Sequence, residues 1–120
     1  MLGTIPPRIL THNCTLDVCT GHDAYRMPVW QSHSVTRVHF QTGAFTRKTR
    51  ENTEVALQGI LFVDARLSTP KLDWFALSRQ SEEAGESLRV TVNGNVYTVL
   101  SVDALPDDTG RLHHFEVSLV

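Results

Sequence analysis

The residues of this 120-residue chain that could do chemistry include two cysteines, six histidines and one adjacent pair of aspartates. Neighbouring residues of a strand point to opposite faces, so His113 and His114 are poorly placed to hold one metal ion together. Neither has a cysteine or carboxylate at a zinc-like spacing. Asp107 and Asp108 lie between a proline and a glycine, which is typical of a turn rather than of an acid–base pair. We therefore predict no metal site and no paired-carboxylate site.

The two cysteines, Cys14 and Cys19, are too few for a disulfide framework. Five positions apart on one strand, they would point to opposite faces, and we expect free, buried thiols. Cys14 with a histidine could form a nucleophile pair, but the chain contains no GxSxG, no HExxH and no phosphate-cradling glycine loop. An enzyme is therefore the weakest functional alternative, and Cys14→Ser would abolish any such activity.

The segment from Thr42 to Thr53 lacks an apolar period and combines cations with one aromatic residue. These residues are Phe45, Arg47, Lys48 and Arg50. Cations give sequence-independent affinity for phosphates, so the segment is a candidate DNA contact. A solvated surface loop is the alternative.

A second group, Trp74, Phe75 and Leu77, lies in the long connection from Ala65 to Ser87. Aromatic residues concentrate at the centres of protein interfaces, so this group is a candidate partner contact. Packing back over the open end of a barrel is an equally favoured alternative. Thr69-Pro70 is a candidate start of a short helix here, and Gly85 would end it.

Alternation of apolar and polar residues predicts strands along most of the chain. Asn93-Gly94, between two β-rich runs, predicts a tight hairpin, and Gly59 inside an apolar run predicts a bulge or a close backbone approach. The expected strands are Leu10 to Val18, Trp30 to Gln41, Glu54 to Val63, Leu88 to Val92, Val96 to Val102 and Leu112 to Leu119.

The last three strands form a meander with one apolar face, which requires a second layer or closure into a barrel. We predict one all-β domain over residues 1–120, a small barrel or sandwich of about six strands with a C-terminal three-stranded meander. Residues 1–9 would form an extended arm because of Pro6-Pro7, and residues 42–53 and 65–87 would form long loops.

The composition excludes some classes of partner. A net charge of −2 gives no general attraction to nucleic acid or to an anionic membrane. The longest apolar runs fall far short of the roughly 20 residues of a membrane span. The first residues do not form a signal-peptide pattern, so we expect assembly in the cytoplasm of the producing cell.

Three segments in this order resemble the small minor capsid proteins of tailed phages and prophages, which belong with the head-completion or head–tail stopper proteins of long-tailed phages. The segments are ILFVDAR followed by Pro70, VTVNGNVYTVLSVDAL, and RLHHFEVSLV. They cover Ile60 to Val120, whereas Leu10 to Gln41 fits in strand order only. The residues that match the family pattern most directly are Asp64, Asn93, Gly94, His113, His114, Phe115 and Glu116.

The resemblance implies a virion protein of the head–tail interface with no enzymatic activity and no cofactor. Such proteins form a ring of identical subunits between the portal and its adaptor above and the tail below. The ring closes the DNA channel after packaging. On this basis we expect the basic segment to face the channel and its DNA, and the Trp74 group to contact a neighbour. Another head–tail joining role, as an adaptor or in tail-end closure, stays open. So does a small nucleic-acid-binding β-barrel, which would need more stacking aromatics.

Overall fold

A computed structural model describes residues 7–48 and 51–120, which form six strands and one α-helix. In chain order the elements are the 3-10 turn η1 (Pro7–Ile9), β1 (His12–His22), β2 (Pro28–Lys48), β3 (Glu54–Asp64), α1 (Trp74–Glu83), β4 (Arg89–Val92), β5 (Asn95–Pro106) and β6 (Leu112–Leu119). The expected extended arm over residues 1–9 lies mostly outside the described residues, and its last part is a helical turn instead.

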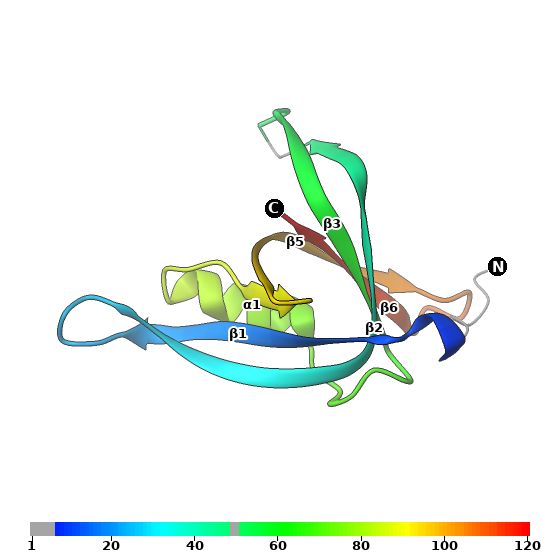
Figure 1. Cartoon of the computed structure of the whole chain (residues 1–120), viewed down its shortest axis with the longest axis horizontal. Coiled ribbons are helices and arrows are strands. Elements are labelled where there is room, and N and C mark those ends of the chain that lie inside the picture. Colours follow the sequence, from blue (N-terminus) through cyan, green and yellow to red (C-terminus); the bar gives the residue numbers. More distant parts are fainter. Residues whose placement is uncertain (1–6, 49–50) are drawn as a thin grey trace.

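The strands form a closed antiparallel ring in the order β1-β2-β3-β6-β5-β4, in which β4 returns to pair with β1 (Figure 1). Closure satisfies the backbone groups that an open sheet would leave unpaired at its edges. The prediction of one small all-β barrel or sandwich of about six strands is confirmed, and so is the C-terminal meander, which consists of β4, β5 and β6.

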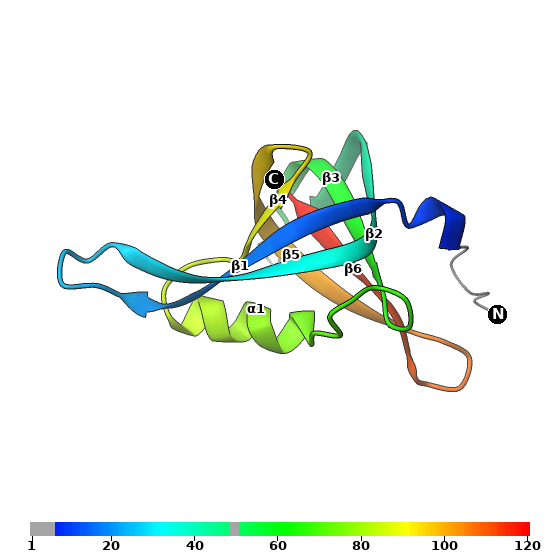
Figure 2. The same ribbon diagram turned by 60° about the horizontal axis from the view of Figure 1, so that its bottom comes forward.

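The core lies inside the ring, where alternate residues of each strand meet. Helix α1 packs against β1 and β5 and adds an aromatic side chain to this core (Figure 2). The fully buried side chains include Leu16, Val18, Val35, Val38, Leu61, Trp74, Leu88, Val90, Val117 and Leu119.

Gly59 lies where β3 passes directly under an aromatic ring of β2. A Cβ atom at this position would lie 2.6 Å from Cε1 of Phe40 and 2.9 Å from the carbonyl oxygen of Gln41. The predicted close approach is confirmed. The β2–β3 register shifts next to it, between Thr42 and Phe45.

Both predicted turns of the meander are confirmed. Asn93 and Gly94 have φ angles of 53° and 78°, as a two-residue hairpin turn of type I′ requires. In the second turn the Asp107 carboxylate accepts hydrogen bonds from the Thr109 hydroxyl at 2.6 Å and the Thr109 amide at 2.8 Å. These bonds stabilise the charged form and lower the pKa of Asp107 below its ordinary value.

The segment 42–53, which the sequence predicts as a loop, is instead largely strand. β2 continues to Lys48, and its residues pair with β3 up to Lys48 opposite Glu54. β1 likewise runs past its predicted end at Val18 to His22, which lies opposite Pro28. Both extensions are two-stranded ribbons outside the closed ring. Their residues need not alternate between a buried apolar face and a solvent face, and this alternation is the pattern from which the strands were predicted.

The connection 65–87 contains the helix α1, which begins later than Thr69-Pro70. Asp73 is its N-cap, and the carboxylate of this residue accepts the amide of Ala76 at 3.1 Å. Gly85, with a φ of 106°, follows the helix C-cap, as predicted. The helix places three successive features of this connection around one end of the barrel: a buried Trp74, a half-exposed Phe75 and the loop that precedes Asp73.

Candidate functional site

Two β-hairpins project from the barrel in different directions (Figure 1). The β1–β2 arm comprises residues 18–30, where β1 has left β4 and continues paired with β2. The β2–β3 arm comprises residues 42–48 and 51–58, where β3 continues beyond its pairing with β6. Such ribbons extend the reach of a small domain, which is useful for contacts with neighbours in an assembly.

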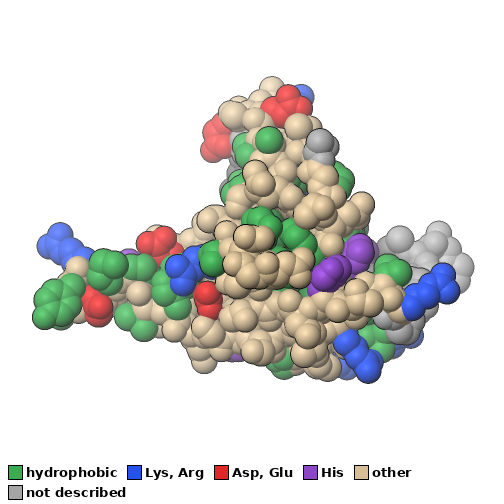
Figure 3. Space-filling model, in the orientation of Figure 1, with side chains coloured by type: hydrophobic (Ala, Val, Ile, Leu, Met, Phe, Trp, Pro, Cys, Tyr) green, Lys and Arg blue, Asp and Glu red, His purple; other side chains and the backbone are tan. Residues whose placement is uncertain are grey.

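The tip of the β1–β2 arm, residues 23–27, is a hydrogen-bonded turn that exposes apolar side chains. The Asp23 carboxylate accepts the amides of Tyr25 at 2.8 Å and Met27 at 3.0 Å, and Arg26 adopts a φ of 63°. Tyr25 is 87% exposed and Met27 is 60% exposed. In Figure 3 the corresponding hydrophobic surface lies at the far end of the arm. This tip lies between two strands expected from the sequence, Leu10 to Val18 and Trp30 to Gln41, and no pattern in the sequence indicates its exposed apolar side chains.

The β2–β3 arm carries the predicted basic segment, but its cations do not form one free cluster. Arg47 contacts the Asp103 carboxylate at 2.5 Å and donates to the Ser118 hydroxyl at 3.2 Å, so its charge is turned toward β5 and β6. Lys48 is exposed, and Phe45 lies half-buried. Arg50 lies outside the described residues.

The predicted aromatic group divides into different environments. Trp74 is fully buried in the core and Leu77 packs partly buried against it, so the barrel-packing alternative holds for these two residues. Trp74 therefore belongs to the core and is not on the surface of the isolated chain. Phe75 is 49% exposed and remains available to a partner.

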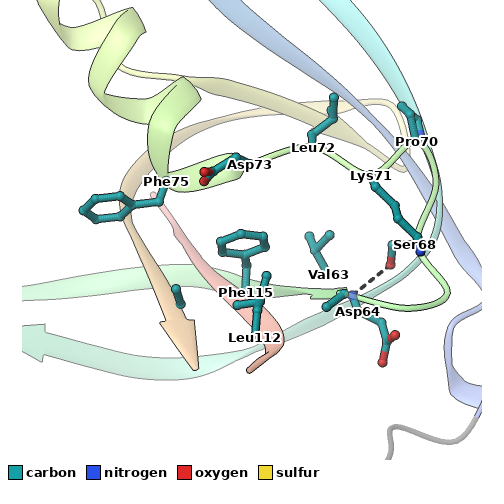
Figure 4. A pocket seen from close by; sticks show the side chains of 12 residues that line it. Val63, Asp64, Ser68, Pro70, Lys71, Leu72, Asp73, Phe75, Leu112 and Phe115 are labelled. Atoms are coloured by element: carbon teal, nitrogen blue, oxygen red, sulfur yellow. Dashed lines mark hydrogen bonds between the residues drawn. The ribbon is translucent and has the colours of Figure 1, made fainter. Parts of the chain in front are cut away.

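Phe75 lies on the wall of a pocket of about 470 Å³ between the start of α1 and the ends of β3, β5 and β6 (Figure 4). The lining is mostly apolar and includes Phe115 and the half-exposed Leu112. Asp64, Lys71 and Asp73 supply the charged groups of this helix pocket. Pairing between distant strands assembles it, so no local sequence signal indicates it.

Asp64 has a structural part in the helix pocket. Its buried carboxylate accepts the amides of Arg66 at 2.7 Å and Leu67 at 2.8 Å, and its own amide donates to the Ser68 hydroxyl at 2.9 Å (Figure 4). The Ser68 hydroxyl in turn donates to the carbonyl of Arg37. These bonds fix the loop that forms one wall of the pocket.

His113 and His114 do not point apart as predicted. Their Nδ1 atoms lie 2.7 Å from each other, and Nε2 of His114 lies 3.5 Å from a Glu116 carboxylate oxygen. Leu105 pairs with His114 while Pro106 pairs with Leu112, so β6 contains one extra residue at this point. Such a bulge redirects a side chain and breaks the strict alternation of faces. Phe115, by contrast, is buried in the core, and Asn93 and Gly94 form the β4–β5 turn.

Both cysteines are free and buried, as predicted, and they lie on opposite faces of β1. Cys14 belongs to the barrel core, where burial raises the pKa of its thiol to about 12. Cys19 lies beneath α1, where its amide donates to the Ser81 hydroxyl at 3.0 Å. A thiol kept neutral in an apolar environment is a poor nucleophile.

We expect neither thiol to react with a thiol-specific reagent such as Ellman's reagent in the native protein at pH 8, whereas both react in denaturant. The reason is that burial blocks access to both thiols and suppresses the thiolate of Cys14. The measurement is the absorbance released per chain in the two conditions. Rapid native labelling of Cys14 would contradict its placement in the core.

A protein-family model with the description "Minor capsid protein" matches residues 6–119 of the chain. No curated protein and no solved structure matches it. Among residues 7–48 and 51–120, no three or more His, Cys, Asp or Glu side chains are grouped so that they could hold a metal ion. The helix in that part of the chain is too short to cross a membrane.

Proposed function

The chain belongs to the minor capsid protein family of phages, and from this premise we propose that it forms a ring in the phage neck. The ring lies below the portal and its adaptor, closes the DNA channel after packaging and provides the surface on which the tail docks. The family supports a structural role in the virion, and the resemblance of the three C-terminal segments to stopper proteins supports this position.

The observation that carries the proposal is the pair of hairpin arms projecting from a closed barrel (Figure 1). The molecule measures 49 Å along its longest axis, against 33 Å and 29 Å along the others. A subunit in a ring needs different surfaces for its two neighbours and for the rings above and below. A rigid barrel with arms in separate directions supplies such surfaces.

Electron cryomicroscopy of the virion neck tests the proposal directly. We expect density for a ring of this barrel between the portal–adaptor assembly and the tail. Density elsewhere in the virion would retain the structural role but discard the stopper position. Absence from the particle would discard both and favour the nucleic-acid-binding barrel.

Within this proposal the β2–β3 arm is the part that approaches the channel. Arg47 is paired with Asp103, and exposed Glu51 and Glu54 accompany Lys48, so the arm carries mixed charge. The contribution of Lys48 to DNA contact can therefore be tested by itself. Replacing Arg47 would also break the ion pair with Asp103.

We expect Lys48→Glu to lower the fraction of heads that retain their DNA severalfold while leaving the fold intact, because the side chain is exposed. The measurement is the ratio of filled to empty heads after tail joining. Glu51→Lys on the same arm is the matched control and should retain DNA at least as well as the natural chain. Equal retention of DNA by both variants would contradict the proposal that this arm faces the channel.

A further inference from the structure

We propose that the tip of the β1–β2 arm of one subunit inserts into the helix pocket of the next subunit, with Tyr25 as the anchor. This inference deepens the proposed ring and rests on it. The occupant of the pocket is thus a second copy of this chain, and the contact is head to tail.

The exposed apolar side chains of the described residues support this pairing. Seven large hydrophobic residues are exposed there; Tyr25, Met27 and Val29 lie on the β1–β2 arm, and Phe75 and Leu112 line the pocket. Burying such side chains away from water is favourable in proportion to the apolar area that is covered. Both surfaces therefore expose apolar side chains whose burial is favourable, and a contact between them would bury both.

The shapes of the two surfaces are also suited to each other. The pocket has a volume of about 470 Å³, which accommodates an aromatic side chain together with an adjacent side chain of the arm tip. Tyr25 stands out from a turn that the Asp23 carboxylate holds rigid, and the pocket wall is held by Asp64 and Ser68. Preformed partners lose little conformational entropy on binding, and tyrosine anchors are frequent at interface centres.

The charges at the two surfaces favour one orientation of the contact. Arg26, at the arm tip, has no ion-pair partner among the described residues. The pocket presents the carboxylate of Asp73, which lies beside Phe75 (Figure 4). The pocket also carries exposed Lys71, so an arm inserted with Tyr25 in the pocket is favoured in the orientation that brings Arg26 to Asp73 and away from Lys71.

An arm cannot reach the pocket of its own chain. The base of the tip lies at the C-terminal end of α1, where a Cβ atom on Gly85 would approach Cε1 of His22 to 3.1 Å. The pocket lies at the opposite end of the helix, beside Asp73 and Phe75. Ten helical residues separate the two by about 15 Å. The contact is therefore between subunits, and repeated head-to-tail contacts close into a ring when their rotation permits.

Cross-linking of two single-cysteine variants tests the inference. Chains carrying Ala24→Cys, at the exposed residue next to the Tyr25 anchor, and chains carrying Leu112→Cys are mixed and treated with a short bismaleimide, both as concentrated purified protein and in assembled particles. Both positions are exposed and the natural thiols are buried, so the variants should fold and react only at the new site. We expect the mixed dimer to form at least severalfold more than either homodimer, and Arg26→Glu to reduce it.

Val96→Cys, at another exposed apolar position, is the matched control and should give little mixed dimer with Leu112→Cys. Mixed dimers in particles alone still support the inference, because a template can sum contacts that are weak individually. Predominant Ala24→Cys homodimers, equal yields with the control, or cross-links from Leu112→Cys only to another virion protein would overturn it. Electron cryomicroscopy of the neck of the natural virion tests the proposed ring separately. A ring seen there without this cross-link would contradict the arm contact but not the ring.

Discussion

Replacing Trp74 with alanine should lower the free energy of unfolding by about 3–5 kcal/mol, the usual cost of removing a large aromatic side chain from a core. Trp74 is 0% exposed and joins α1 to the barrel interior. Its removal leaves a cavity where the helix covers the strands. Urea denaturation followed by circular dichroism measures the change.

Phe75 is the matched control, because it is the next residue and also aromatic but lies at the surface. We expect Phe75→Ala to cost less than about 1 kcal/mol, as substitutions away from the core usually do. Similar losses for the two variants would show that the helix does not dock through Trp74. The contrast also decides how interface variants are chosen, since a Trp74 variant tests folding and a Phe75 variant tests contact.

Replacing Gly59 with alanine should destabilise the protein by about 1–3 kcal/mol, the typical cost of overpacking. The added methyl group would lie 2.6 Å from Cε1 of Phe40 and 2.9 Å from the Gln41 carbonyl oxygen, so both the ring and the backbone of β2 would have to move. Equilibrium unfolding in urea gives the magnitude.

A double-mutant cycle with Phe40→Leu identifies the cause. In the Phe40→Leu background the ring atoms are gone, so the added methyl group should cost clearly less than in the natural chain. Part of the cost should persist because the Gln41 carbonyl remains. Strictly additive losses would mean that the contact with the ring is unimportant.

The local features of the fold were predictable from the sequence because short stretches encode them. Asn93-Gly94 specifies its hairpin turn through the backbone freedom of two residues, and β6 has the bounds that its alternation predicts. Gly59 within an apolar run indicated that another part of the chain approaches the backbone closely, because glycine has no side chain. The sequence did not identify the partner, Phe40. The sequence signal for each of these features lies in one short stretch of the chain.

The arms and the helix pocket were not predictable in this way. In the ribbon beyond Gly59, Phe45 pairs with Leu57 whereas Lys48 pairs with Glu54, so the β2 side of the ribbon lacks the regular apolar period that marks a strand in a sheet. The His113–His114 contact depends on a bulge set by pairing with β5. The pocket brings Val63, Phe75, Ala104 and Leu112 together, and only tertiary structure determines their meeting.

The position of β6 has a consequence for the synthesis of the protein. β6 follows the other five strands in the chain, yet it lies between β3 and β5 in the ring. Ribosomes add roughly 5–20 residues per second, so the fifty or so residues between β3 and β6 take on the order of several seconds to appear. During that interval β3 has a free edge, and the nascent chain depends on its surroundings to prevent wrong pairing. The barrel is therefore expected to close only after the last strand has left the ribosome exit tunnel.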